Sequence, residues 1–345
     1  MIAIMQNRAA TERFGVLLTG AGSAARRHAQ NLRVLAPGAD LLMVCRGDES
    51  RQGAAECGAT PVSSVEEGLQ GRPRIGVVCS ASASHARDLA LLMPHVDGLY
   101  IEKPVVTEAA GVHALEALLD AGWNRPTVVG CNLRYLGAIQ KLKDACDSGQ
   151  AGEPAAASLQ VGQWLPDWRP QRDHRGSYSA HRTQGGGVIF DLVHELDSAC
   201  FLFGDIAQGQ AAAGRAGSLG IDADAAAAIV LLMKRGLPVQ VSLDYVSRKP
   251  VREYRVVGDL ATLRLDLIAQ ELVRIGPQGS EQISTAAADW DLAASYRAAM
   301  QDLLTACETG SATRYGLKQA LHTTSWMIRL ENLAWRIDEP ARPSP

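Results

Sequence analysis

A lysine and a histidine are the residues of this chain whose types and settings best suit proton transfer. Lys103 lies in Glu102-Lys103-Pro104, directly after the apolar run 99–101. A partly buried lysine at the end of a strand donates a hydrogen bond to a substrate hydroxyl or a developing alkoxide, and its pKa responds to burial. His194 follows Asp191 by three residues, a spacing that places both side chains on one helix face. A histidine beside a carboxylate suits general acid–base catalysis near neutral pH, although such pairs are often purely structural.

A turn of small residues carries a second signal, for phosphate binding. It reads Gly20, Ala21, Gly22, Ser23, Ala24 and Ala25, between the apolar run 16–19 and a helical stretch at 24–35. The first glycine permits a tight turn, the second lets the backbone approach a pyrophosphate, and the small Ala25 allows close packing of helix and strand. The N–H groups at the start of the helix then favour phosphate. We expect a dinucleotide-binding turn here; the alternative is a glycine-rich turn that binds nothing.

The end of the next apolar run, 41–45, bears on which dinucleotide is bound. Arg46 follows this run and suits the 2′-phosphate of NADP, whereas a carboxylate here typically binds the ribose of NAD. Asp48 lies two residues further on, within reach of the ribose. NADP is therefore slightly favoured over NAD, and a solvated charge at a strand end is the alternative for Arg46.

The elements that would position these residues alternate regularly over residues 15–131. Apolar runs lie at 15–18, 41–45, 75–79, 99–101 and 127–130, and helical stretches at 24–35, 53–56, 65–69, 85–93 and 107–121. Continuous apolar strands between helices are typical of a parallel sheet buried on both faces. Right-handed crossovers then predict an α/β fold with a doubly wound Rossmann domain over residues 14–131.

The pattern changes after residue 131, and we expect a second domain over 132–338. Helices are predicted at 136–148, 188–203, 296–308 and 317–336, and strands at 225–234, 238–246, 252–257, 262–267 and 271–275. Hairpin turns between these strands indicate a mostly antiparallel sheet. The longest apolar run, 225–233, is interpreted as a buried strand. Residues 1–14 are expected to form a short flexible lead, and 339–345 a flexible tail.

Residues 163–182 form a polar stretch suited to wrapping a substrate. The stretch contains Trp168, Tyr178 and four arginines, at 169, 172, 175 and 182. Arginine binds phosphate or carboxylate in a bidentate manner, and aromatic rings stack on a sugar or a base. This composition predicts an anionic sugar, such as a sugar acid or a nucleotide-linked sugar. A subunit interface, where Trp, Tyr and Arg are also enriched, is an alternative of similar weight.

Composition narrows the class of protein without identifying it. Over 345 residues, 34 Lys+Arg and 37 Asp+Glu give a formal net charge of −3, which does not favour nucleic-acid binding. The longest apolar run is too short to span a membrane. Seven scattered cysteines without a CxxC pair predict reduced thiols in a cytoplasmic protein, and the cysteines and histidines lack the spacing of a metal site.

Five motifs together resemble the Gfo/Idh/MocA (glucose–fructose oxidoreductase / inositol dehydrogenase) family. They are GAGSAARRH at 20–28, CSASASH at 79–85, EKP at 102–104, GCNLRY at 130–135 and GGGVIFDLVHELD at 185–197. The resemblance implies a Rossmann domain followed by an α+β domain with a large open-faced sheet, and NAD(P)-linked oxidation or reduction of sugars and polyols. It also implies homodimers or homotetramers that associate through that sheet. The alternatives are a non-catalytic NAD(P)-binding regulator, and an enzyme that recycles its cofactor while it cleaves, hydrolyses or epimerises a sugar.

The motifs and the resemblance together assign roles to particular residues. Catalytic roles fall on Lys103, which polarises the substrate oxygen, on His194, which exchanges the proton, and on Asp191, which orients the histidine. The family usually separates that acid and histidine by four residues, whereas here they are three apart. Cofactor contacts are expected from Gly20, Gly22, Ser23, Ala24, Ala25, Arg46, Ser80, Ala81, His85, Glu102, Lys103 and Asn132. Substrate contacts are expected from Arg134, Tyr135, Trp168, Arg175, Tyr178 and His194. His28 and His85 also match family histidines in structural positions.

Overall fold

The computed structural model describes residues 14–336 except 169 and 172, and these form two compact units. The first unit comprises residues 14–135 and Leu292–Thr324, and the second comprises Leu136–Asp291 and residues 325–336. The expected tail 339–345 and, apart from Phe14, the expected lead lie outside the described residues. No helix in the described part of the chain is long and apolar enough to cross a membrane.

The first unit contains a parallel sheet, as its alternating pattern predicts. Its strands are β1 (Gly15–Leu18), β2 (Asp40–Val44), β3 (Thr60–Val62), β4 (Ile75–Val78), β5 (Gly98–Ile101) and β6 (Thr127–Val129). They lie in the order β3-β2-β1-β4-β5-β6, and every pair is parallel. The order reverses between β1 and β4, and ligands of such sheets bind beyond the carboxyl ends of the strands at this point. The predicted doubly wound fold is confirmed.

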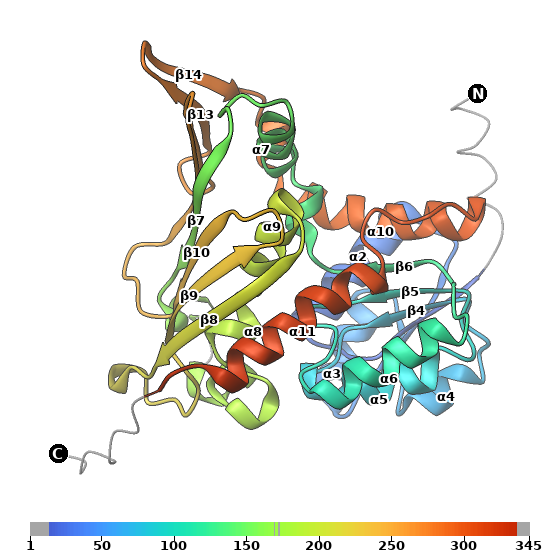
Figure 1. Ribbon diagram of the computed structural model, residues 1–345. Helices are drawn as coiled ribbons and strands as arrows, with labels where there is room; N and C mark the ends of the chain where they lie inside the picture. Colours follow the sequence, from blue (N-terminus) through green and yellow to red (C-terminus); the bar gives the residue numbers. More distant parts are fainter. Residues whose placement is uncertain (1–13, 169, 172, 337–345) are drawn as a thin grey trace. The chain divides into compact units, whose positions relative to one another are not determined.

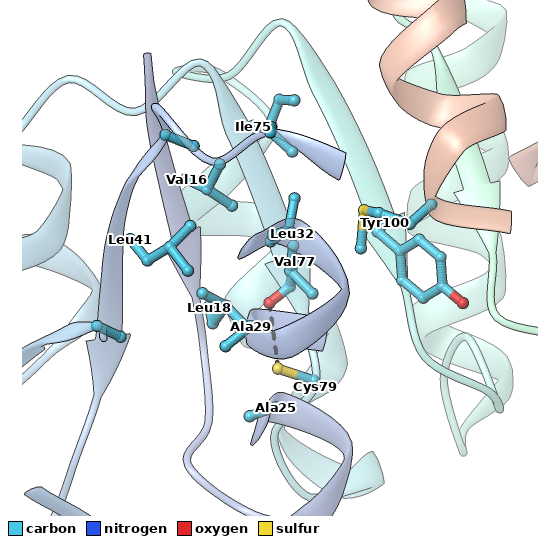
Figure 2. Packing of buried hydrophobic residues seen from close by; sticks show 14 of the residues in the cluster. Val16, Leu18, Ala25, Ala29, Leu32, Leu41, Ile75, Val77, Cys79 and Tyr100 are labelled. Atoms are coloured by element: carbon cyan, nitrogen blue, oxygen red, sulfur yellow. Dashed lines mark hydrogen bonds between the residues drawn. The ribbon is translucent and has the colours of Figure 1, made fainter. Parts of the chain in front are cut away.

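Helices cover both faces of this sheet (Figure 1). They are α2 (Ser23–Leu35), α3 (Asp48–Glu56), α4 (Val65–Leu69), α5 (His85–Leu92), α6 (Ala109–Asp120) and α10 (Leu292–Thr309). The first half of α11 (Leu317–Leu333) belongs to the same unit. Side chains on one face of β1, among them Val16 and Leu18, pack against Ala25 and Leu32 of α2 (Figure 2). Buried residues of α10, such as Leu303, join the same cluster.

The place of α10 differs from the expected domain boundary. The predicted second domain, 132–338, included residues 292–324, but this segment packs with the first unit. The reason is the apolar stripe of α10, whose Ala299, Met300 and Leu303 are fully buried against the sheet face that α2 covers. Burial of such side chains outweighs proximity in sequence, because each contributes roughly 1–3 kcal/mol.

The second unit contains a larger, mostly antiparallel sheet, as expected. Its strands are β7 (Pro154–Gly162), β8 (Ile206–Gly214), β9 (Ala226–Met233), β10 (Pro238–Asp244), β11 (Val251–Gly258), β12 (Thr262–Asp266), β13 (Glu271–Gly276) and β14 (Gly279–Ser284). They lie in the order β14-β13-β12-β11-β7-β10-β9-β8, and only β7 and β10 are paired in parallel. Strands β7, β8 and β14 carry no strand signal in the sequence, because they are rich in Ala, Gly, Ser and Gln.

Helices α7 (Gly137–Asp147), α8 (Val188–Asp191) and α9 (His194–Phe203) pack on one face of this sheet (Figure 1). The apolar run that forms β9 is not buried on both sides, contrary to expectation. Ile229 and Leu231 are buried, whereas Val230 is 62% and Leu232 39% exposed. The strand alternates because helices cover only the face toward which Ile229 and Leu231 point.

Candidate active-site residues

The phosphate-binding turn lies between β1 and α2, and its two glycines serve different steric purposes. A Cβ added at Gly20 would lie 2.7 Å from the backbone oxygen of Cys79, whereas one at Gly22 would meet nothing within 4 Å. Gly22 is the N-cap of α2; no described side chain caps it, and the first turn contains no acidic residue. The following Ser23 and Ala24 start the helix, and Ala25 is fully buried. Open space above a helix N-terminus suits the pyrophosphate of a dinucleotide.

The residues expected to choose between NADP and NAD lie beyond the end of β2. Arg46 is exposed, and Gly47 is the N-cap of α3, whose first turn contains Asp48. Asp48 is exposed as well. Both side chains that the sequence singled out therefore lie at the carboxyl edge of the sheet, as a ribose-binding position requires.

The turn after β4 holds Ser80, Ala81 and His85. The Ser80 hydroxyl donates to Asp88 at 2.7 Å, and Ala81 is exposed as the N-cap of a short 3₁₀ turn. His85 is 1% exposed; its Nδ1 lies 2.8 Å from the Pro104 carbonyl oxygen and its Nε2 3.2 Å from that of Ser80. Burial lowers the pKa of His85. The ring thus faces the interior and holds the chain, as expected of a structural histidine, and its expected cofactor contact stays a prediction.

Lys103 is half-buried at the carboxyl end of β5, in a turn anchored by Glu102. Glu102 Oε1 lies 2.7 Å from Nε2 of the buried His28, and its Oε2 accepts the backbone N–H of Lys103 at 3.2 Å. Burial by itself raises the pKa of the Glu102 carboxyl, but the hydrogen bond and charge of His28, and then the charge of Lys103, outweigh burial and lower that pKa. Because β1, β4 and β5 are neighbours, the turns of Gly20, Ser80 and Lys103 share one edge of the sheet.

Three residues expected to bind ligands, Asn132, Arg134 and Tyr135, also contact other parts of the first unit. The Asn132 amide donates to Ser295 of α10 at 2.9 Å, and Asn132 is 1% exposed. The Arg134 guanidinium lies 3.6 Å from the ring centroid of Tyr315. The Tyr135 hydroxyl donates to Asp302 of α10 at 2.8 Å. These contacts connect residues 132–135 to a segment about half the chain away, which sequence patterns do not reveal.

The second unit carries Asp191 and His194, but on two helices rather than one. The predicted helix 188–203 is interrupted at Leu192, whose φ of −97° and ψ of 29° end α8; His194 is the first residue of α9. The argument that a three-residue spacing puts both side chains on one helix face is therefore wrong here. Asp191 is 5% exposed and accepts a hydrogen bond from Tyr245 at 2.7 Å; His194 is half-buried.

The glycines before α8 pack against the chain itself. A Cβ at Gly186 would overlap the backbone oxygen of Tyr178, and Gly187 has a φ of +110° that disfavours any side chain. Backbone hydrogen bonds from Gly186 to His181 and from Gly187 to Ser179 hold this segment together.

Tyr245 is a residue that the sequence reasoning missed. It follows β10, is fully buried, and donates its hydroxyl to Asp191. Burial, followed by the charge of Asp191, raises the pKa of Tyr245 well above its usual value. The Trp168 ring meets Tyr245 edge-on at a centroid distance of 5.3 Å. Trp168, Tyr245 and Asp191 therefore form one connected group, which the sequence did not signal because Tyr245 lay inside the predicted strand 238–246.

The arginines of the polar stretch are largely engaged with carboxylates. Arg169 and Arg172 lie outside the described residues. Arg175 is exposed and pairs with Asp173 at 2.8 Å, and its hydrogen bonds lower the pKa of Asp173 to about 2. Arg182 contacts Glu331 at 2.6 Å and Asp224 at 2.9 Å. Tyr178 is half-buried. The two described arginines thus stabilise the stretch itself.

Both units match family models. Residues 14–128 match the oxidoreductase family with an NAD-binding Rossmann fold, and residues 139–264 match the GFO/IDH/MocA C-terminal domain. Inositol 2-dehydrogenase of Acidothermus cellulolyticus is 29% identical over 204 residues, 57% of this chain and 56% of that protein, so the match spans little more than half of that relative. D-apiose dehydrogenase of Paraburkholderia graminis is 26% identical over 264 residues, 74% of this chain and 68% of that protein.

A solved structure extends the likeness to nearly the whole fold. An oxidoreductase from Agrobacterium radiobacter, in complex with NAD+, L-tartaric acid and magnesium, matches with a TM-score of 0.77. The match covers 93% of this chain and 95% of that chain at 20% identity, and it therefore concerns the fold alone.

Proposed function

Because the chain belongs to the Gfo/Idh/MocA family of oxidoreductases, we propose that it transfers a hydride between the nicotinamide of NAD or NADP and a hydroxyl or keto carbon of a sugar or sugar derivative. The observation that carries this proposal lies at one edge of the first sheet. Gly22 offers open space at the start of α2, and Lys103 ends β5 two strands away. A nicotinamide-dependent reaction at this edge needs a turn that binds the pyrophosphate of the cofactor and a hydrogen-bond donor, such as a lysine, for the reacting oxygen.

The cofactor would be held by the turn that contains Gly20, Gly22 and Ser23, with its pyrophosphate against the N-terminus of α2. When bound, its nicotinamide supplies or accepts the hydride. The exposed guanidinium of Arg46 supports NADP over NAD, because it suits a 2′-phosphate.

Lys103 and His194 are proposed to handle the proton. In the oxidative direction, Lys103 donates a hydrogen bond to the reacting oxygen, and His194 takes up the hydroxyl proton. Asp191 is proposed to orient His194, and the hydroxyl of Tyr245 fixes the position of the Asp191 carboxylate. The substrate is proposed to be a sugar acid or a nucleotide-linked sugar, because the sequence of that stretch combines the aromatic residues Trp168 and Tyr178 with four arginines.

The exposed face of the second sheet is the proposed surface of self-association. Val230, Leu232 and Val257 are 62%, 39% and 39% exposed on strands of this sheet. An apolar sheet face of this kind suits a partner of the same kind, and we propose a homodimer or homotetramer. Seven scattered cysteines without a CxxC pair support a reducing compartment such as the cytoplasm.

The test combines nucleotide titration with turnover. Protein stripped of nucleotide is titrated with NADPH and NADH, and is then supplied with NADP+ or NAD+ as the hydride acceptor together with myo-inositol, D-apiose, a uronic acid or a UDP-sugar. Lys103→Ala should abolish the change in NAD(P)H absorbance while nucleotide affinity is kept; Lys234→Ala, an exposed lysine of the second unit, is the matched control. Turnover unaffected by Lys103→Ala, or no nucleotide binding by folded protein, would contradict the proposal. Substrate turnover with retained cofactor and no net NAD(P)H change would favour the recycling alternative.

A further inference from the structure

The turn that carries Lys103 is connected to α2 through a fully buried histidine. His28 lies on α2, five residues after the helix begins at Ser23, and none of its side chain is exposed. Its Nε2 lies 2.7 Å from Oε1 of Glu102, and Oε2 of the same carboxylate accepts the backbone N–H of Lys103 at 3.2 Å. Because the lowered pKa of Glu102 keeps it ionised, it accepts at both oxygens, and His28 donates from Nε2. One carboxylate therefore links α2 to the peptide group that precedes the Lys103 side chain.

A second buried histidine holds the other end of the same turn. His85 begins α5, is 1% exposed, and contacts the carbonyl of Pro104 at 2.8 Å from Nδ1 and that of Ser80 at 3.2 Å from Nε2. A neutral imidazole has one N–H, and the shorter contact assigns it to Nδ1. His85 thus fixes the carbonyl of the residue that follows Lys103, from the turn after the neighbouring strand β4.

The contacts of the two rings are more specific than filling the core requires. An apolar side chain would fill the space of His28 beside Tyr100, whose ring centroid lies 4.4 Å away, without burying polar nitrogens. Both histidines instead direct a donor at the Glu102-Lys103-Pro104 turn from elements that follow β1 and β4. These are the elements whose turns are proposed to hold the cofactor.

We propose that His28 and His85 are positioning residues for Lys103: His28, through Glu102, and His85, through the Pro104 carbonyl, hold the two ends of the turn so that the lysine keeps one orientation at the cofactor edge. This inference rests on the proposed function for its catalytic meaning. Its structural content, that the two rings set the environment of Lys103, stands by itself. A misplaced lysine would keep nucleotide binding but lower turnover on the order of tenfold to a hundredfold.

The two rings use different nitrogens, which allows a crossed test with amides. A glutamine amide nitrogen lies near the position of a histidine Nε2, and an asparagine amide nitrogen near that of Nδ1. His28→Gln and His85→Asn are therefore the matched variants, and His28→Asn and His85→Gln the mismatched ones. His113→Asn, at an exposed histidine on α6, is the control. Each protein is treated briefly with trinitrobenzenesulfonate, and the labelling rate of every lysine is read by peptide mass spectrometry; melting temperature, nucleotide affinity and turnover are measured in parallel.

In both mismatched variants we expect the labelling rate of Lys103 to change severalfold, while the rates of the other lysines stay unaltered. In the two matched variants the labelling rate of Lys103 should return toward the wild-type rate. If Lys103 were labelled at the wild-type rate in all four variants, the inference would be overturned, even if the melting temperature fell. Altered Lys103 labelling without any loss of turnover would instead leave the positioning intact and contradict the proposed catalytic role of Lys103. If a mismatched variant does not fold, Glu102→Gln replaces it, because an amide cannot accept from both His28 and Lys103.

Discussion

Substituting alanine at the two glycines of the phosphate-binding turn separates folding from ligand binding. At Gly20 an added methyl would lie 2.7 Å from the Cys79 oxygen and 3.1 Å from the Ser80 Cα, both backbone atoms that resist displacement. At Gly22 the methyl would meet nothing within 4 Å, and the φ of −75° and ψ of −172° suit any residue. The same chemical change should therefore have opposite consequences two residues apart.

The magnitudes follow from these distances. Gly20→Ala should destabilise the first unit by about 1–3 kcal/mol, the usual cost of overpacking. Gly22→Ala should cost only a few tenths to about 1 kcal/mol, the difference between glycine and alanine at an N-cap. Its methyl would, however, take the space that a pyrophosphate needs, and nucleotide affinity should fall on the order of tenfold to a hundredfold, equivalent to about 1.4–2.8 kcal/mol.

The assay pairs urea unfolding with fluorescence titration by NADPH and NADH for both variants. Gly217→Ala is the matched control, since a Cβ there also meets nothing within 4 Å and it lies in the second unit. Wild-type nucleotide affinity in folded Gly22→Ala would refute the placement of the pyrophosphate against this turn. Unchanged stability of Gly20→Ala would refute the steric argument.

Three further predictions concern pH, a buried ion pair and association. Because the pKa of Glu102 is lowered in the folded state, its ionised carboxylate stabilises the protein at pH values above the usual carboxyl pKa, and this stabilisation disappears as pH falls through the folded-state pKa. Between about pH 7 and about pH 3, the free energy of unfolding measured in urea should therefore fall more steeply for wild type than for Glu102→Gln. Arg252→Leu should destabilise the protein by about 3–5 kcal/mol, because it removes the cation that lies 2.7 Å from the fully buried carboxylate of Glu195. The double variant Arg252→Leu/Glu195→Leu should recover much of that lost stability, measured by chemical denaturation. Replacing the exposed Val230 and Leu232 together by lysine should leave the melting temperature of the chain within a few degrees but lower the mass found by analytical ultracentrifugation, and an unaltered mass would argue against association through this face.

Local pattern was sufficient for the first sheet except its edge strand β3, which the apolar runs did not predict, and for the outline of the second sheet. About twenty consecutive residues contain the apolar run that forms β1, the small residues after it and the apolar stripe of α2. All three can be predicted there because apolar periodicity and turn chemistry are local properties. The same holds for the hairpins around β9 to β13. The positions of Gly20, Ser80 and Lys103 at one edge follow from strand alternation and the handedness of crossovers, which need no knowledge of side-chain contacts.

Contacts between distant segments were decided only by the tertiary structure. The pairing of His28 with Glu102 joins residues 74 positions apart, and that of Asp191 with Tyr245 joins residues 54 apart. Asn132 and Tyr135 contact α10, more than 160 residues later, because the apolar face of that helix is buried most fully on the first sheet. The sequence by itself determined most of the elements and the edge of the first sheet at which Gly20, Ser80 and Lys103 lie. Which polar groups meet at that edge depends on which apolar faces of distant helices and strands are buried against each other, and no local sequence pattern contains that information.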